Sequence, residues 1–261
     1  RAERDHNSVI LRQADRAGLD FFGYKVLDQA TLDDLDKKLR AYGVETERVP
    51  AGELLETGER VRFQIPTGHM IELYADKTAV GSKVGNLNPD MDVIDSPGIC
   101  PIRLDHCLIY GTDLDGARDL FTQVLGFTLV ERALLEDGKT DLGVWLTCSA
   151  KAHDIAMVRH GEPAKLHHVS FQLGSWEQVL RAADIMSKNR VSIDMGPTRH
   201  GITNGTTIYF FDPSGNRLET FAGGYDHYPD MAPITWTWDE IGAGIFYHDR
   251  KLNPAFLSVV T

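Results

Sequence analysis

Two histidines and one glutamate stand where their side chains could meet around a metal ion. His106 and His168 each lie near the start of a predicted strand, and Glu219 lies on a later predicted strand. Side chains that point inward from such strands can converge on one cavity. Two neutral imidazoles and a carboxylate form the facial triad of non-haem Fe(II) oxygenases, which leaves coordination positions open. A histidine on a strand is more often a core or surface residue than a metal ligand. From these three residues alone, a structural role is therefore as well supported as a metal site.

The elements that would position these residues follow an internal repeat. Two segments align without a gap at an offset of 147 residues, and this alignment pairs Glu72 with Glu219. Self-similarity at a fixed offset indicates duplicated structural units. At the same offset His168 corresponds to Phe21, so the N-terminal copy lacks the imidazole. We therefore expect this copy to bind no iron and Glu72 to be a structural remnant.

Each copy of the repeat reads as a strand, a helix and further strands. In the second copy, residues 169–173 alternate in polarity, which predicts a strand. Ser175 and Gln178 then have the spacing of a capping box at the start of a helix. In the first copy Asp28 holds the equivalent cap position, and Gly43 can end the helix in a left-handed turn. A third unit of the same kind begins at the strand that carries His106.

These units predict two domains and a tail. We expect residues 1–75 to form a non-catalytic N-terminal domain that is truncated at its start, followed by a linker over 76–101 with loop composition. Residues 102–222 are expected to form the catalytic, iron-binding domain. The tail over 223–261 is rich in aromatic residues, so we expect it to pack on the catalytic domain rather than to be disordered.

The composition disfavours several classes of protein. Hydrophobic residues make up 42% and charged residues 25%, an ordinary globular balance. The formal net charge of −11 argues against nucleic-acid and anionic-membrane partners. No apolar run approaches the roughly 20 residues that a membrane span needs. The 3 cysteines have no CxxC spacing, so we expect reduced thiols in the cytoplasm rather than a disulfide framework or a zinc ribbon.

The most specific motif surrounds Glu219. Residues 198–219 read TRHGITNGTTIYFFDPSGNRLE. This string resembles the signature of type I extradiol ring-cleavage dioxygenases: a histidine, an aliphatic–tyrosine pair, Asp-Pro-x-Gly and a glutamate ligand. The strands around His106 and His168 resemble the strands that carry the family's other two ligands. The resemblance covers nearly the whole chain, and the subgroup it favours is catechol 2,3-dioxygenase, or metapyrocatechase.

The resemblance implies an α+β fold of the vicinal oxygen chelate type, which is also that of glyoxalases and bleomycin-resistance proteins. In this fold, repeated βαβββ modules form two domains around a cavity, and the first module of this chain would be incomplete at its N-terminus. The resemblance further implies Fe(II) held by His106, His168 and Glu219, and a homotetramer. The expected partners are a catechol-type substrate and O2, with no nucleic acid and no membrane.

The resemblance also assigns roles to residues around the metal. His153 falls where the family places its acid/base residue, so we expect it to take up a proton from the substrate and return it later. His200 and Tyr209 are expected to donate hydrogen bonds to the substrate oxygens as charge develops there. The aromatic ring needs an apolar slot, and the residues expected to line it are Trp145, Leu146, Ile155, Ile202, Thr203 and Phe256.

Two further histidines near these motifs receive lesser roles. His167 precedes a predicted ligand, and strand alternation places it on the opposite face of the sheet, so we interpret it as structural. His248 in the tail is a weaker candidate for a residue that supports the metal ligands.

The implied reaction is extradiol, or meta, cleavage of catechol or a methyl-substituted catechol by O2 to a 2-hydroxymuconic semialdehyde, within aromatic hydrocarbon degradation. Three alternatives stay open. The first is cleavage of bicyclic substrates of the 2,3-dihydroxybiphenyl type. The second is a metal-free protein that binds small aromatic molecules, because one fold can serve unrelated functions. The third is a glyoxalase-like isomerase. Manganese would be bound by the same ligands as iron.

Overall fold

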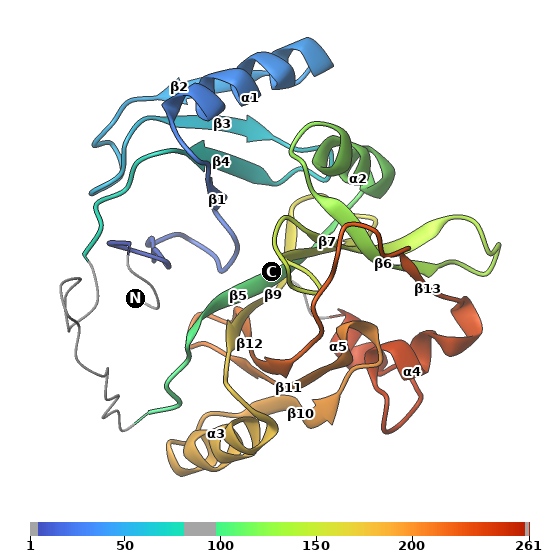
Figure 1. Cartoon of the computed structure of the whole chain (residues 1–261). Coiled ribbons are helices and arrows are strands. Elements are labelled where there is room, and N and C mark those ends of the chain that lie inside the picture. Colours follow the sequence, from blue (N-terminus) through green and yellow to red (C-terminus); the bar gives the residue numbers. More distant parts are fainter. Residues whose placement is uncertain (1–4, 81–97, 259–260) are drawn as a thin grey trace.

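Three βαβββ modules make up most of the chain, as predicted for the vicinal oxygen chelate fold (Figure 1). The structure is a computed structural model that describes residues 5–80, 98–258 and 261. Residues 81–97, the greater part of the predicted linker, lie outside the described residues.

The first module forms a four-stranded sheet in the order β1-β4-β3-β2, with one helix against it. Its helix begins and ends where the sequence predicts. The Asp28 side chain accepts a hydrogen bond from the Thr31 amide, and Gly43 closes the helix with a φ of 97°. The elements are β1 (Phe22–Lys25), α1 (Gln29–Tyr42), β2 (Thr46–Val49), β3 (Arg60–Gln64) and β4 (Met70–Tyr74).

The second and third modules repeat this order of elements. The second consists of β5 (Arg103–Gly111), α2 (Leu114–Gln123), β6 (Thr128–Leu134), β7 (Asp141–Thr147) and β8 (Ile155–Arg159). The third consists of β9 (Lys165–Gln172), α3 (Trp176–Lys188), β10 (Ile193–Arg199), β11 (Gly205–Phe211) and β12 (Arg217–Gly223). Helices α1 and α3, and likewise strands β4 and β12, begin 147 residues apart, which confirms the predicted repeat.

The second and third modules share one sheet of nine strands with β13 (Ile234–Trp236) from the C-terminal segment, in the order β10-β11-β12-β9-β5-β8-β7-β6-β13. The antiparallel pair β5 and β9 joins them at the centre. The sheet curves around an interior that faces the C-terminal segment (Figure 1). His106, His168 and Glu219 therefore lie on three adjacent strands, β5, β9 and β12.

The outer face of this sheet is sealed by hydrophobic packing. One buried cluster joins α1 and the first sheet to α2, β5, β7 and β8, and it includes Leu32, Phe63, Ile71, Ile109, Phe121, Leu146 and Met157. A second cluster packs α3 onto β11 and β12 through Val179, Ala182, Met186, Ile208 and Ala222. Both clusters lie behind the strands that carry the candidate ligands, so the sheet presents these ligands from a rigid support.

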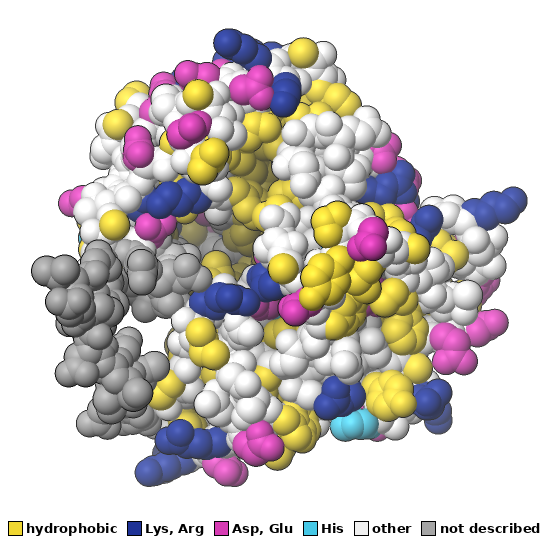
Figure 2. All heavy atoms as spheres, in the orientation of Figure 1, with side chains coloured by type: hydrophobic (Ala, Val, Ile, Leu, Met, Phe, Trp, Pro, Cys, Tyr) yellow, Lys and Arg dark blue, Asp and Glu magenta, His cyan; other side chains and the backbone are white. Residues whose placement is uncertain are grey.

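The C-terminal segment packs against the same body. It contains β13 (Ile234–Trp236), which pairs with β6, and the short helices α4 (Ile241–Ile245) and α5 (Pro254–Ser258). Two 3-10 turns, η1 (Ile202–Asn204) and η2 (Trp238–Glu240), complete the elements. Acidic and basic side chains are interspersed over the face of the molecule in Figure 2. Among the described residues, no helix combines the length and the apolar character needed to span a bilayer.

Candidate active site

The structure brings the three predicted metal ligands together. His106, His168 and Glu219 are buried, and one ligand atom from each lies within 4.8 Å of the other two. Glu219 Oε2 is 2.9 Å from His106 Nε2 and 3.4 Å from His168 Nε2. Two imidazole nitrogens and one carboxylate oxygen thus face a common point, as a facial triad requires.

The environment of Glu219 fits a bound cation. Its Oε1 atom accepts a hydrogen bond from the Thr207 hydroxyl. Its Oε2 atom is fully buried and faces the Nε2 atoms of both His106 and His168. A buried carboxylate oxygen is costly unless it is paired with a cation or coordinates a metal. The donor set and this oxygen together fit a divalent metal.

The charges of the triad depend on each other. Burial disfavours a charged His106, but hydrogen bonds to Asp105 and Glu219 outweigh it and raise the His106 pKa to about 9. Burial also disfavours a charged Glu219, yet the imidazoles of His168 and His106 hold its pKa well below the usual range. Without a metal, the site therefore keeps one proton between His106 and Glu219 at neutral pH. A metal cation would replace that proton.

Asp105 holds the first imidazole in place. Its carboxylate accepts a hydrogen bond from His106 Nδ1 at 2.8 Å, and the Lys151 ammonium lies 3.2 Å from its other oxygen. This contact leaves Nε2 of His106 as the atom directed at Glu219. The sequence motif contains Asp105 directly before His106, but the partnership was not predicted, because alternation along a strand does not indicate contacts between neighbours.

His153 lies against the first ligand, where an acid/base residue would be useful. Its ring centroid is 3.9 Å from that of His106, and its side chain is buried. Burial and the nearby His106 lower the pKa of His153 well below the usual value, so the imidazole is neutral. Phe221 lies nearly perpendicular to both rings in T-shaped contacts.

His200 and Tyr209 form a hydrogen-bonded pair beside Glu219. The tautomer of His200 follows from its partners: Nδ1 donates to the carbonyl oxygen of Ile245, so Nε2 accepts from the Tyr209 hydroxyl at 2.7 Å. His200 Nε2 is also 3.7 Å from Glu219 Oε1. The two side chains that the sequence predicts to face the substrate therefore both line the cavity beside the ligands.

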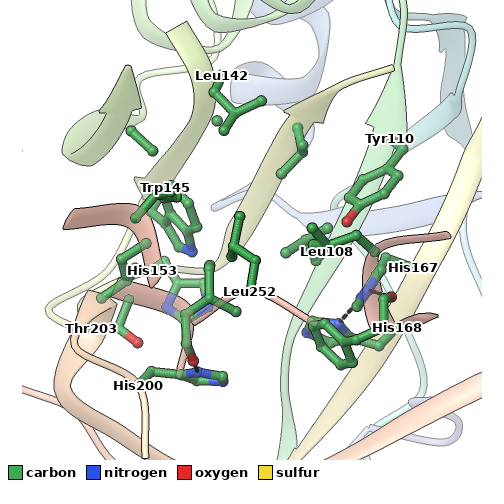
Figure 3. Close-up of a pocket in the computed structure, with 18 of the residues that line it drawn as sticks. Leu108, Tyr110, Leu142, Trp145, His153, His167, His168, His200, Thr203 and Leu252 are labelled. Carbon is green, nitrogen blue, oxygen red and sulfur yellow. Dashed lines mark hydrogen bonds between the residues drawn. The ribbon is translucent and has the colours of Figure 1, made fainter. Parts of the chain in front are cut away.

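The cavity beside the triad has a volume of about 260 Å³ (Figure 3). Four of the predicted lining residues, Trp145, Ile202, Thr203 and Phe256, do line it. The other two, Leu146 and Ile155, lie instead in the core behind the sheet, because neighbouring strand residues such as Trp145 and Leu146 point to opposite faces. The apolar lining also includes side chains that the sequence did not indicate: Leu108, Leu142, Ile241, Ile245, Leu252 and Leu257.

The predicted orientation of His167 is wrong. Leu108 pairs with His168 whereas Ile109 pairs with Leu166, so His167 is an extra residue in β9. Such a bulge interrupts the alternation of side chains. His167 consequently lines the cavity beside His168, with the two Nδ1 atoms 2.7 Å apart (Figure 3).

His248, the weaker candidate in the tail, is exposed and does not line the cavity. His160, which received no role, also lines the cavity and packs against Tyr110, with ring centroids 5.5 Å apart. Its position could not be inferred without the fold, because it follows the end of β8 rather than a recognisable motif.

The N-terminal counterpart of Glu219 has different partners. Glu72 is fully buried, with Arg60 Nε at 2.8 Å and Arg62 Nη2 at 2.6 Å from its oxygens. At the repeat offset these arginines occupy the positions of Thr207 and Tyr209. Guanidinium groups thus compensate the buried charge in the first module, and Glu72 forms a buried ion-pair network there.

Comparisons with known proteins place both parts of the chain in described families. Residues 19–78 match the catechol 2,3-dioxygenase-like N-terminal domain. Residues 103–220 match the glyoxalase/bleomycin resistance protein/dioxygenase superfamily. The two matches cover the first module and the two modules that share the large sheet.

Individual proteins are similar over almost the full chain. A metapyrocatechase of Pseudomonas sp. (strain CF600) is 51% identical over 99% of this chain and 84% of its own length. A manganese-dependent 2,3-dihydroxybiphenyl 1,2-dioxygenase of Geobacillus genomosp. 3 is 30% identical over 96% of this chain and 81% of its own. The crystal structure of the 2,3-dioxygenase LapB from Pseudomonas sp. KL28 superposes with a TM-score of 0.86 and 60% identity, over 91% of this chain and 83% of that one.

Proposed function

Because this chain belongs to the extradiol dioxygenases of the vicinal oxygen chelate superfamily, we propose that it opens catechol or a methyl-substituted catechol with O2. The product of this extradiol cleavage is a 2-hydroxymuconic semialdehyde. The observation that carries the proposal is the buried convergence of His106, His168 and Glu219 at one end of an apolar cavity.

We propose Fe(II) as the metal, held by these three residues. Two imidazoles and one carboxylate with open positions are typical of non-haem Fe(II) oxygenases. These three side chains would hold the ion, which would supply Lewis acidity toward the catechol oxygens and a redox-active centre for the reaction with O2. A relative that is 30% identical is manganese-dependent, so the identity of the metal needs a direct test.

The surrounding residues supply proton handling and orientation. We propose that neutral His153 takes up a proton from a catechol hydroxyl, since its imidazole lies against His106 and lines the cavity. The Tyr209 hydroxyl and His200 Nε2 share a proton in the absence of substrate. With substrate present, this pair can redirect its hydrogen bond to a substrate oxygen and stabilise the charge that develops there.

The size and lining of the cavity favour a single aromatic ring. Ligand pockets commonly measure roughly 300–1,000 Å³, and this cavity of about 260 Å³ lies below that range. Trp145, Ile202 and Leu108 offer apolar contact to a ring rather than hydrogen bonds. A metal-free protein that sequesters aromatic molecules has no need of two imidazoles and a carboxylate that converge beside its cavity.

We also propose a homotetramer in the cytoplasm. Cys107 and Cys148 form no disulfide within the described residues, in agreement with a reducing compartment. Several large apolar side chains are exposed and could be covered by subunit association; they include Tyr228, Met231, Ile234 and Trp238. Light scattering on the purified protein should give the mass of four chains, and the mass of one chain would contradict the proposal.

The reaction is tested by loading the protein with Fe(II) without oxygen, adding catechol and then admitting air. We expect the yellow ring-fission product to form, whereas a glyoxalase-like isomerase would consume no oxygen. A parallel sample loaded with Mn(II) tests the metal, and equal turnover there would contradict the assignment of iron. Faster turnover of 2,3-dihydroxybiphenyl than of catechol would favour the bicyclic alternative. No product from either substrate with either metal would overturn the proposed function.

A further inference from the structure

Glu131 is a buried carboxylate outside the metal site. It lies on β6 with 1% of its surface exposed, and within the described residues no lysine, arginine or histidine forms an ion pair with it. Three neutral donors converge on it instead. Its Oε1 accepts from the Thr203 amide at 2.6 Å and from the Tyr225 hydroxyl at 2.7 Å, and its Oε2 accepts from Trp236 Nε1 at 2.7 Å.

One of these donors belongs to the loop that carries His200. Thr203 lies three residues after His200, lines the substrate cavity and has a left-handed φ of 58°. A threonine in this region is strained by an amount of order 1–3 kcal/mol and needs support from its surroundings. The hydrogen bond from its amide to Glu131 supplies such support at the strained residue itself.

Trp236, which also donates to Glu131, packs against the same loop. A methyl group added to Gly201 would lie 2.7 Å from the Trp236 ring, and one added to Gly244 would lie 3.3 Å from it. The Trp236 ring therefore packs directly against the backbone that follows His200. Gly201 also donates to the Gly244 carbonyl at 2.9 Å, which ties the loop to α4. Glu131 thus holds residues 200–204 directly at Thr203 and indirectly through Trp236.

We propose that Glu131 is a positioning residue, which fixes the 200–204 loop so that His200 and Thr203 face the bound substrate. The inference rests on the proposed function in so far as His200 serves catalysis. A carboxylate suits this task because its two oxygens accept several hydrogen bonds and donate none. A glutamine in its place would turn an NH2 group toward one of the three donors.

The test compares Glu131→Gln with Glu136→Gln, an exposed carboxylate that follows the same strand. In Fe(II)-loaded protein with catechol and air, we expect E131Q to lower kcat by about 10- to 100-fold, because small misplacements of catalytic groups have effects of this size. We expect iron content to be unchanged and E136Q to behave as the wild type. In a His200→Asn background, the same E131Q change should lower kcat by less than about twofold.

A readout without metal or substrate keeps the inference separate from the proposed function. In metal-free protein with nitrogen-15-labelled histidine, the Nδ1 proton of His200, which donates to Ile245, should exchange slowly with water. In E131Q this exchange should be at least about tenfold faster. If E131Q changed neither the exchange rate nor kcat, the positioning role would be overturned. The same would follow if E131Q lowered kcat equally in the wild type and in the His200→Asn background. If the wild type failed to cleave catechol but E131Q still accelerated the exchange, the proposed function would be wrong and the positioning of His200 by Glu131 would stand.

Discussion

The Asp105 carboxylate accepts a hydrogen bond from His106 Nδ1 at 2.8 Å, and this contact directs the opposite nitrogen of the ring toward Glu219. Lys151 in turn holds Asp105, so the orientation of the first imidazole is set by a chain of charged contacts. A ligand that is oriented in advance loses less freedom when it binds a metal.

Replacing Asp105 with Asn should therefore weaken metal binding. We expect the dissociation constant for Fe(II) or Co(II) to rise about 10- to 100-fold, the usual effect of losing a residue that orients a histidine ligand. Competition with a chelator of known affinity measures it. Asp184→Asn, at an exposed position on α3, is the control and should leave affinity unchanged. Wild-type affinity in D105N would contradict the orienting role of Asp105.

Ligand and acid/base roles can be separated by two alanine substitutions. His168→Ala removes an imidazole from the triad, so both bound metal and ring cleavage should be lost. His153→Ala should keep the metal, since His153 is not among the clustered ligand atoms, but should slow turnover by about 10²- to 10⁴-fold. Metal analysis and oxygen uptake on the same samples provide the comparison. If H153A lost its metal, the division of roles would be wrong.

The raised pKa of His106 predicts how the stability of the metal-free protein depends on pH. A histidine pKa raised to about 9 in the folded state means that the folded state holds its proton more tightly than the unfolded chain. The resulting stabilisation is fully present below the unfolded pKa of about 6.5 and is lost as pH rises through 9, an effect on the order of 3 kcal/mol.

Urea unfolding at pH 6.5 and pH 9.5 measures this dependence. The metal-free wild type should lose stability between these values, and His106→Asn should lose markedly less. The metal-loaded protein should not show the His106 contribution, because the metal has already replaced the proton. Equal pH dependence of the wild type and H106N would show that another group is responsible.

Breaking the ion-pair network of the first module should affect stability but not metal binding. Glu72→Gln leaves Arg60, which is 1% exposed, without a carboxylate on one side. We expect a loss of about 3–5 kcal/mol in the free energy of unfolding, as for other buried pairs that lose one partner. Glu47→Gln, at an exposed position, should cost at most about 1 kcal/mol. A reduced metal content in folded E72Q would contradict the structural role of Glu72.

The repeat explains why much of the fold could be predicted from the sequence. Local signals such as the Asp28 cap and the Gly43 stop act within one helix, so they can be recognised from the sequence alone. The 147-residue offset then indicates that the two modules it relates have the same order of elements. The triad could be predicted because the string around Glu219 and the strands around His106 and His168 resemble those of a known family. The cavity lining was only partly predictable, since Leu142, Ile241 and Leu252 come from segments whose arrangement depends on the tertiary fold.

Two features of the site could not be obtained from local patterns. The bulge at His167 inserts one residue into β9, and periodicity cannot detect this without knowledge of the pairing with β5. The donors that hold Glu131 are 72, 94 and 105 residues away in the chain. A lone glutamate in an apolar strand therefore gives no sign of its partners.

Anomalous X-ray diffraction from crystals loaded with Fe(II) without oxygen tests the metal centre most directly. Data above and below the iron absorption edge should give one strong peak per chain, within bonding distance of His106 Nε2, His168 Nε2 and a Glu219 oxygen, and catechol soaked in should contact the same peak through both hydroxyls. A peak at any other group of residues, or no peak in protein that binds iron in solution, would contradict the account.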